Sequence, residues 1–321
     1  MSQKDFVQVE NLCKYYPVPK KKFWEKRRYV RAVDNVSFSI QRGETFGLVG
    51  ESGCGKSTTG FMINGLLHTT CGNIRFDGKD ITLTKEKEIR EKMQVVFQDP
   101  YASLNPKKKI GWILEEPLLI HKKYSKEKRY QKVSQMMELV GFDESFKNRY
   151  PHELSGGQRQ RIGIARALML SPQFIILDEP VSALDVSVQA QILNLLKELQ
   201  SKLGLTYLFI SHDLNVVHYM CDRVGVMYSG KIVETSSVEK IYERAVHPYT
   251  KLLLSTIPSK NIDFDENQML LKEELSLENH KNGCAFYPRC PYRMEICQTR
   301  FPELREIEKG HYATCHLYHE D

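Results

Sequence analysis

A single glycine-rich stretch constrains this chain more than any other feature of the sequence. Between Leu48 and Thr58 the residues match G-x-x-x-x-G-K-[S/T], the P-loop pattern. The apolar run Phe46 to Val49 predicts a buried strand before the loop, and a helix is expected to begin after Lys56. Such a loop turns its N–H groups inward, where they bind phosphate oxygens together with the helix N-terminus. A glycine-rich turn could match by chance, but the order of strand, loop and helix favours a phosphate site.

The P-loop pattern assigns roles to its residues. Lys56 should reach the β- and γ-phosphates of a nucleotide, and the Ser57 hydroxyl should ligate Mg²⁺. The other residues expected to contact the phosphates are Gly50, Ser52, Gly53, Cys54, Gly55 and Thr58. The sequence therefore predicts a nucleoside triphosphate and Mg²⁺ as bound groups.

The composition is that of a soluble globular protein. Of the 321 residues, 41% are hydrophobic and 27% are charged. No run of 18 apolar residues occurs, so we expect no membrane-spanning helix. The polar start, Met1 to Asp5, precedes no apolar segment, which argues against a signal peptide and predicts a cytoplasmic protein. The net charge of +6 permits a nucleic acid or an anionic membrane surface as partner but requires neither.

Strands and helices are expected to alternate after the P-loop, which predicts an α/β fold with a mostly parallel core. Phe174 to Leu177 is an apolar run without alternation, typical of a parallel strand buried on both faces, and Leu205 to Ile210 predicts the next strand. Ligands collect at the carboxyl ends of such strands. The candidate sites at these ends are the P-loop, Asp178 with Glu179, and His212.

Asp178 and Glu179 are the candidate acidic residues of the reaction. Asp178 fits a Walker B aspartate, which holds Mg²⁺ directly or through water, and Glu179 can polarise the attacking water. A positioned base typically contributes about 10² to 10⁴ in rate. The pair alone could be a turn at the end of a strand, but the P-loop upstream favours the catalytic interpretation. Gln98 and His212 are weak signals by themselves, since a histidine in such a place can be purely structural.

The pentapeptide Leu154-Ser155-Gly156-Gly157-Gln158 decides the class, because it is the ABC signature. With every motif in order, the chain resembles ABC-type ATPases over most of its length. The resemblance implies a RecA-like core, an antiparallel β subdomain and an α-helical signature subdomain. It also implies roles for single residues: Tyr16, rather than Tyr15, stacks on adenine, Gln98 is the Q-loop glutamine near Mg²⁺, His212 contacts the γ-phosphate, and Asp185 ends the D-loop that begins at Ser182.

The signature predicts a second phosphate site on the same chain. Ser155, with the N–H groups of Gly156 and Gly157 and with Gln158 beside them, lies at an expected helix N-terminus, which binds anions. The P-loop already supplies this chain with a phosphate site. A second anion site is therefore most useful if it closes over ATP held by another subunit. The resemblance implies the same arrangement, a head-to-tail dimer with two ATP molecules at the interface. Each γ-phosphate would contact both subunits, and hydrolysis would remove this link.

Further motifs resemble the oligopeptide/dipeptide importers, and Val181-Ser182 resembles their F-type ATPase subunits. The matching stretches include Arg31 to Phe38, His247 to Thr250 and the cysteine spacing after Gly283. The resemblance implies a heterodimer with a D-type ATPase, two membrane permeases, an extracytoplasmic peptide-binding protein and a place at the cytoplasmic face of the membrane. One alternative is an importer of nickel or another small solute. The other is a soluble ABC ATPase acting on nucleic acid or ribosomes, which a single P-loop without sustained heptads disfavours.

Four cysteines are crowded near the C-terminus: Cys284, Cys290, Cys297 and Cys315. Their spacing lacks the close C-x2–4-C pair common in zinc sites, and four thiolates suit a [4Fe–4S] cluster at least as well. The resemblance to peptide importers supports a cluster. Free, partly buried thiols are the alternative, and His311 and His316 are not assigned as ligands.

These features predict two domains. Residues 1–245 should form the ABC ATPase domain, with a helical subdomain at about 104–165, and 246–321 a C-terminal extension with the four cysteines. Within the extension, Asn261 to Asn282 is polar and acidic, which predicts a linker. The basic stretch Pro19 to Arg28 predicts a solvated loop, or else a contact with anionic lipid or a partner subunit.

Overall fold

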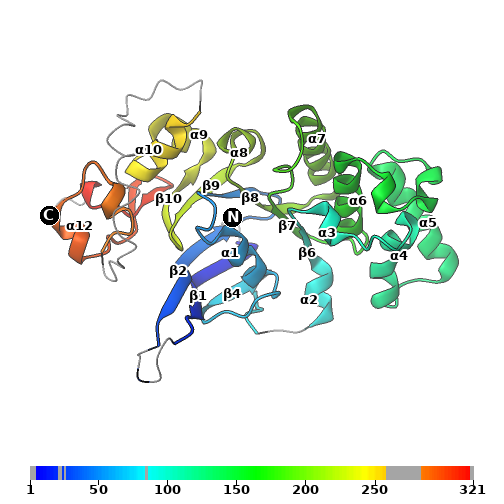
Figure 1. Cartoon of the computed structure of the whole chain (residues 1–321), viewed down its shortest axis with the longest axis horizontal. Coiled ribbons are helices and arrows are strands. Elements are labelled where there is room, and N and C mark those ends of the chain that lie inside the picture. The colour runs from blue at the N-terminus through cyan, green and yellow to red at the C-terminus, as the bar shows by residue number, and fades with distance from the viewer. Residues whose placement is uncertain (1–4, 21–23, 25–26, 84–85, 258–282, 319–321) are drawn as a thin grey trace. The chain divides into compact units, whose positions relative to one another are not determined.

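The computed structural model describes residues 5–20, 24, 27–83, 86–257 and 283–318. The chain divides into two compact units, whose elements are labelled in Figure 1. Unit 1 comprises Met1–Ile40, Thr45–Thr82 and Ser211–Asp321, and unit 2 comprises Gln41–Glu44 and Leu83–Ile210. The predicted linker, Asn261 to Asn282, lies outside the described residues, as does part of the basic stretch. The predicted division into domains at residue 245 stays a prediction.

Unit 1 contains an antiparallel sheet in the order β2-β1-β4-β5. Its strands are β1 (Val7–Pro17), β2 (Tyr29–Ile40), β4 (Cys71–Phe76) and β5 (Lys79–Asp80). In β2 the apolar residues of the second half, such as Val36, Phe38 and Ile40, alternate with more exposed ones, which places one face of the strand in the core. This is the antiparallel β subdomain that the resemblance implied.

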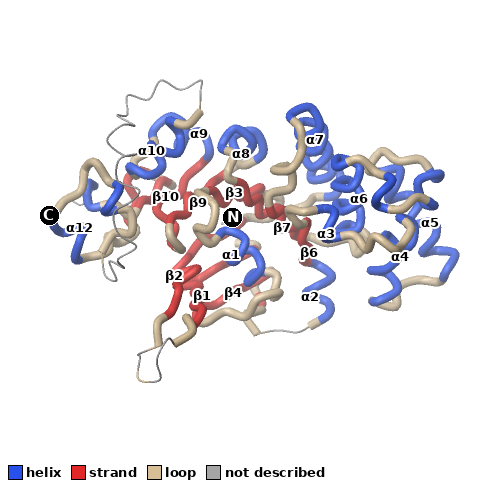
Figure 2. The backbone as a smooth tube through the Cα atoms, viewed as in Figure 1, coloured by secondary structure: helices blue, strands red, loops and turns tan. Residues whose placement is uncertain are grey.

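A second set of strands in unit 1 continues from the P-loop strand to the C-terminus of the chain. β3 (Thr45–Val49) pairs in parallel with β9 (Arg223–Tyr228), which pairs antiparallel with β10 (Lys231–Ser237). β12 (His311–Ala313) then pairs with β10, and β11 (Arg305–Glu308) pairs with β12. The strands appear in red in Figure 2. The segment after residue 283 therefore extends the sheet that begins at the P-loop.

The described α-helices of unit 1 are α1 (Lys56–Ile63), α8 (Leu214–Met220), α9 (Val238–Arg244), α10 (Pro248–Ser255) and α12 (Glu295–Thr299). The short helix predicted after His247 is confirmed as α10. Its N-cap is His247, whose Nδ1 accepts a hydrogen bond from the Tyr249 N–H at 3.0 Å. Burial lowers the pKa of His247 to about 4, so this imidazole is neutral at physiological pH and can serve as acceptor.

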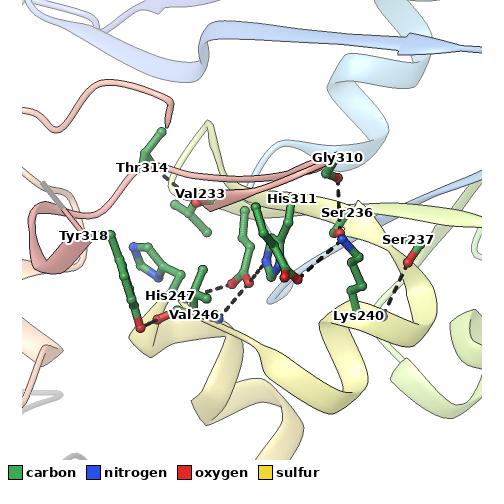
Figure 3. A network of polar contacts seen from close by, with 12 residues as sticks. Val233, Ser236, Ser237, Lys240, Val246, His247, Gly310, His311, Thr314 and Tyr318 are labelled. Atoms are coloured by element: carbon green, nitrogen blue, oxygen red, sulfur yellow. Dashed lines mark hydrogen bonds and ion pairs between the residues drawn. The ribbon is translucent and has the colours of Figure 1, made fainter. Parts of the chain in front are cut away.

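A polar network that includes Val246, His247 and His311 joins the C-terminal strands to the rest of unit 1 (Figure 3). Glu234 of β10 is fully buried and accepts hydrogen bonds from the N–H groups of Val246 and His247 at 2.8 and 2.9 Å. Its Oε1 also lies 2.7 Å from Nε2 of His311 on β12. Burial alone would lower the pKa of His311, but the hydrogen bond and charge of Glu234, helped by Glu308, raise it above its ordinary value.

We expect Glu234→Ala to destabilise the protein by about 3 to 5 kcal/mol, because it leaves the buried His311 imidazole, the buried N–H of His247 and the part-buried N–H of Val246 without their acceptor. Glu239→Ala on the exposed face of α9 is the matched control and should change the free energy of unfolding by less than about 0.5 kcal/mol. Urea unfolding measures both.

The difference between wild type and Glu234→Ala should depend on pH with a defined sign. Because folding raises the pKa of His311, its stabilising contribution is complete below about pH 6.5 and is lost as pH rises through the raised value. The difference should therefore shrink as the pH rises above about 6.5. A difference that grows over this range would contradict the proposed ion pair.

Among the described residues of unit 2, three strands pair in parallel. β6 (Met93–Val96) pairs with β7 (Phe174–Asp178), and β7 pairs with β8 (Thr206–Ser211). Every residue of β7 and β8 is buried, as expected for a parallel strand covered on both faces. The predicted mostly parallel α/β core is confirmed by this pairing.

The helices of unit 2 are α2 (Lys87–Lys92), α3 (Pro100–Ser103), α4 (Ile110–Ile120), α5 (Lys126–Leu139), α6 (Gly156–Leu168) and α7 (Val186–Leu203). Apolar residues of α4, α5 and α6, among them Leu114, Met137 and Ile162, share one buried cluster. The predicted helical region after Pro106 is thus present. Among the described residues, no helix is long and apolar enough to cross a membrane.

Candidate functional site

The P-loop connects β3 to α1 with a backbone that only glycine can adopt at two positions. Gly50 has φ of +151°, and an added Cβ would lie 2.1 Å from the Met227 carbonyl oxygen. Gly55 has φ of +108°, and its Cβ would lie 2.3 Å from the Ala32 carbonyl oxygen. Gly55 is the N-cap of α1 and offers no side chain as a cap. The helix N-terminus is therefore suited to an anion as its capping group.

Lys56 is folded back over this loop. Its side chain is buried, and Nζ donates hydrogen bonds to the carbonyl oxygens of Gly50 at 2.8 Å and Glu51 at 3.0 Å. The ammonium is thus held by backbone carbonyls of the loop that precedes it. The remaining predicted P-loop residues follow the same turn: Ser52 and Gly53 are exposed, Cys54 is buried, and Ser57 and Thr58 are half-buried at the start of α1.

Glu51, in the P-loop, is tied to two residues far along the chain. Its N–H donates to Tyr249 Oη at 2.9 Å, and its two carboxylate oxygens accept from Nη1 and Nη2 of Arg289, each at 2.9 Å. Sequence reasoning missed both partners, because no local pattern connects a residue to one 238 positions away. The only hint was that Arg289 stands next to Cys290 in a motif already noted.

Two adjacent tyrosines of β1 have different surroundings. Tyr15 donates from Oη to Oδ1 of Asp34 at 2.6 Å, and burial and this hydrogen bond raise the pKa of its phenol. Tyr16 is 39% exposed, with the Lys14 ammonium 5.1 Å from its ring centroid. Tyr16 is therefore an exposed tyrosine of β1, and its role against adenine stays a prediction.

In unit 2, three predicted residues gather at the carboxyl end of β7. Asp178 is the buried last residue of the strand. Glu179 follows with φ of +46°, a left-handed conformation rarely adopted by a side chain of this size. Gln98 Nε2 donates to Oε2 of Glu179 at 2.9 Å and lies 3.5 Å from the Ser182 hydroxyl. Gln98 thus orients the carboxylate that is predicted to polarise water.

The signature pentapeptide forms a helix start. Ser155 is the N-cap of α6: its Oγ accepts from the Gln158 N–H at 3.3 Å, and Gln158 Oε1 accepts from the Ser155 N–H at 3.0 Å. This reciprocal capping box fixes the first turn. A Cβ on Gly157 would lie 2.3 Å from Cγ1 of Val188 on α7, so the two helices approach closely there.

Asp185 and His212 lie at two other helix starts. Asp185 is the N-cap of α7 and accepts from the Val188 N–H at 3.0 Å and from the Ser187 hydroxyl at 2.7 Å. These hydrogen bonds lower the pKa of the Asp185 carboxyl, and the bond from the Val188 N–H has the larger effect. His212, in unit 1, is exposed between β8 and α8. Asp185 therefore caps a helix, and its role in the D-loop stays a prediction.

The four C-terminal cysteines line one cavity of about 10 Å³, which is room for one water molecule at most. Burial raises the pKa of the thiols of Cys284, Cys290 (to about 12) and Cys315 (to about 11). Thiolates are the metal-binding form. Within the described ranges, no group of three or more histidine, cysteine or acidic side chains is arranged to hold a metal ion. The donor types thus fit a cluster, but their present spacing does not form a ligand set.

Two histidines near this cavity have structural partners. His316 Nε2 lies 3.0 Å from the Arg300 carbonyl oxygen. His311 is paired with the buried Glu234 described above. Neither histidine had been assigned as a ligand, and these contacts give each of them another role.

Comparison with known proteins gives matches along the whole chain. The family model described as ABC transporter matches residues 33–182, and the model described as Oligopeptide/dipeptide transporter, C-terminal region, matches residues 233–297. The oligopeptide transport ATP-binding protein AppF of Bacillus subtilis is 49% identical over 324 residues, covering 99% of this chain and 98% of the relative. OppF of the same organism is 50% identical and covers 96% of this chain and 95% of the relative.

Two solved structures show the same fold. The ATP-binding cassette MJ0796, in a dimeric post-hydrolysis state with ADP and Pi, gives a TM-score of 0.62 at 32% identity and covers 72% of this chain and 98% of its own. The cbiO1 subunit of the Clostridium perfringens ABC transporter complex cbiONQ gives 0.65 at 29% identity and covers 79% of this chain and 97% of its own.

Proposed function

The chain belongs to the ATP-hydrolysing proteins of ABC transporters that carry the oligopeptide/dipeptide C-terminal region, and we propose that its ATP hydrolysis powers peptide import. The observation that carries the proposal is the presence of both matched regions on one chain that aligns end to end with peptide-transport relatives. The complete P-loop and the Gln98–Glu179 contact agree with hydrolysis on this chain.

ATP and Mg²⁺ are the bound groups that this family implies, and the residues present fit them. Lys56 would bind the β- and γ-phosphates, while Ser57, Gln98 and Asp178 would hold Mg²⁺, which supplies charge neutralisation at the phosphates. Tyr16 would stack on adenine. The remaining P-loop contacts would come from Gly50, Ser52, Gly53, Cys54, Gly55 and Thr58.

Glu179 would polarise the attacking water, and His212 would contact the γ-phosphate. Gln98 keeps the carboxylate of Glu179 oriented through the 2.9 Å hydrogen bond. Gln98 would also be a Mg²⁺ ligand. Loss of the γ-phosphate and Mg²⁺ would therefore change the position of the Glu179 carboxylate through Gln98.

The signature would serve the nucleotide of a partner ATPase in a head-to-tail heterodimer. Ser155, Gly156, Gly157 and Gln158 present a helix N-terminus that the capping box holds in place, and Asp185 caps the neighbouring helix. The family implies a D-type ATPase as this partner, two transmembrane permeases, an extracytoplasmic peptide-binding protein and a peripheral place on the cytoplasmic face of the membrane. We propose no nucleic acid as a partner of this transporter.

Purification of the tagged full-length chain from solubilised membranes tests this assembly. We expect two permeases and a second, different ATPase subunit to co-purify in fixed ratio. A chain recovered only as a homodimer, or together with ribosomes or nucleic acid, would contradict the importer. Retention of nickel rather than peptide by the associated binding protein would replace peptides by nickel as the cargo.

We also propose that the four cysteines are the ligands of a [4Fe–4S] cluster, supported by their shared cavity and by the Cys₄ set such clusters use. The cavity has room for one water molecule at most, so binding a cluster would require it to widen. Anaerobic purification followed by iron, sulfide and zinc analysis should give four iron and four sulfide per chain. Zinc, or no metal, would overturn this proposal.

A further inference from the structure

The cysteine-bearing segment makes a direct ionic contact with the P-loop. Arg289, immediately before Cys290, forms the two-pronged ion pair with Glu51 described above, with both N–O distances at 2.9 Å. The side chain of Arg289 is 19% exposed and that of Glu51 is 40% exposed. Two parallel hydrogen bonds to a half-sheltered carboxylate are geometrically specific, unlike a single exposed ion pair.

Two aromatic rings also hold Arg289 in place. Its guanidinium lies 5.8 Å from the ring centroid of Phe286 and 5.9 Å from that of Tyr228 at the end of β9. Phe286 is buried and packs edge-on against Tyr228 and at a tilt against Tyr249. The hydrogen bond and charge of Glu51 raise the pKa of Arg289 above its ordinary value, so the guanidinium stays charged.

Glu51 is consequently anchored twice, through its N–H to Tyr249 and through its carboxylate to Arg289. Its carbonyl oxygen in turn accepts a hydrogen bond from Lys56 Nζ. The residue therefore connects the C-terminal segment to the lysine that the phosphates require. An unpaired carboxylate in this loop would repel the several negative charges of a nucleoside triphosphate.

We propose that Arg289 is a positioning residue for nucleotide binding, which neutralises and orients Glu51 so that the P-loop can receive the triphosphate. The inference rests on the proposed function, since it needs ATP as the ligand. Through Arg289, the C-terminal segment would support nucleotide binding whether or not the cysteines hold a metal.

The dissociation constant of a fluorescent ATP analogue with Mg²⁺, measured on the full chain, tests this role. Arg289→Ala should raise the constant about tenfold, because Glu51 is left as a free anion in the loop. Arg289→Lys, which keeps the charge but loses the second hydrogen bond, should fall between Arg289→Ala and wild type. Arg293→Ala, an exposed arginine of the same segment, is the matched control and should bind as wild type does.

A second substitution separates electrostatic positioning from simple support of the fold. Adding Glu51→Gln to Arg289→Ala removes the unpaired charge and should return the constant to within about threefold of wild type. The effect of Arg289→Ala alone should also shrink between about 50 and 500 mM salt, because screening weakens the repulsion. In the assembled transporter the KM for ATP should rise while kcat stays within about twofold.

Three results would overturn the proposal: wild-type affinity in Arg289→Ala, a double variant that binds no better than Arg289→Ala, or a loss of affinity that salt does not reduce. If ATP is not the ligand, which the proposed function requires, the result is different. In that case wild type and Lys56→Met would bind the analogue equally poorly, whatever residue stands at position 289.

Discussion

Glu179→Gln is expected to lower ATP turnover by about 10² to 10⁴ in the assembled transporter while leaving ATP binding intact. Glutamine keeps the size of the side chain and its place at the end of β7, but its amide cannot polarise water as a carboxylate does. The affinity should be retained because Lys56 and the P-loop N–H groups, which the substitution leaves unchanged, contact the phosphates. Phosphate release measures turnover, and a nucleotide-binding assay measures the retained affinity.

The control for this variant is Glu198→Gln on α7. Glu198 is 57% exposed and pairs with Lys202 one helical turn away, so its substitution removes a similar charge from unit 2 without touching β7. We expect its turnover to equal that of wild type. Turnover of Glu179→Gln within about threefold of wild type would remove Glu179 from its assigned role.

Lys56→Met should weaken ATP binding by about 10² or more. Methionine retains most of the aliphatic stem and loses the ammonium, and hydrogen bonds to charged groups contribute about 1.5 to 3 kcal/mol each. Two such contacts, to the β- and γ-phosphates, account for the expected loss.

The control for Lys56→Met is Lys202→Met, which removes an equal charge from an exposed ion pair. Its affinity for ATP should be unchanged, and equilibrium binding of a labelled nucleotide compares the two variants. The assignment of Lys56 would be wrong if both bound ATP as wild type does. Urea unfolding of each variant reports whether the substitution also affects the fold.

Local patterns in the sequence predicted the parts of the fold and site that local physics controls. The unbroken apolar run of β7 indicated burial on both faces, and every residue of that strand is buried. The signature predicted a helix start, and Ser155 is the N-cap of α6.

The contacts that the sequence could not predict join residues far apart along the chain. Glu234 meets His311, and Glu51 meets Arg289, across 77 and 238 positions respectively. Each of these residues looks locally like an ordinary charged or polar side chain. Tertiary packing alone brings the partners together, so periodicity and spacing carry no signal for them. The pairing of β12 with β10, which places the C-terminal segment on the sheet, is of the same kind.

For the four C-terminal cysteines, the sequence predicted a shared site but not what the site holds. Their crowding predicted that they share a site, and all four do line one cavity. The choice between a cluster and free thiols depends on the distances between sulfurs, which spacing along the chain does not fix. The raised pKa values of Cys290 and Cys315 follow from burial, which sequence alone also leaves open.

Uptake of a radiolabelled peptide into right-side-out membrane vesicles with enclosed ATP tests most directly whether ATP hydrolysis on this chain drives peptide import. With the wild-type chain, the partner subunits and the binding protein present, peptide should accumulate inside the vesicles. Accumulation should fall to the level of vesicles without ATP when Glu179→Gln replaces the wild-type chain. Equal accumulation with Glu179→Gln, or with the chain omitted, would contradict the account.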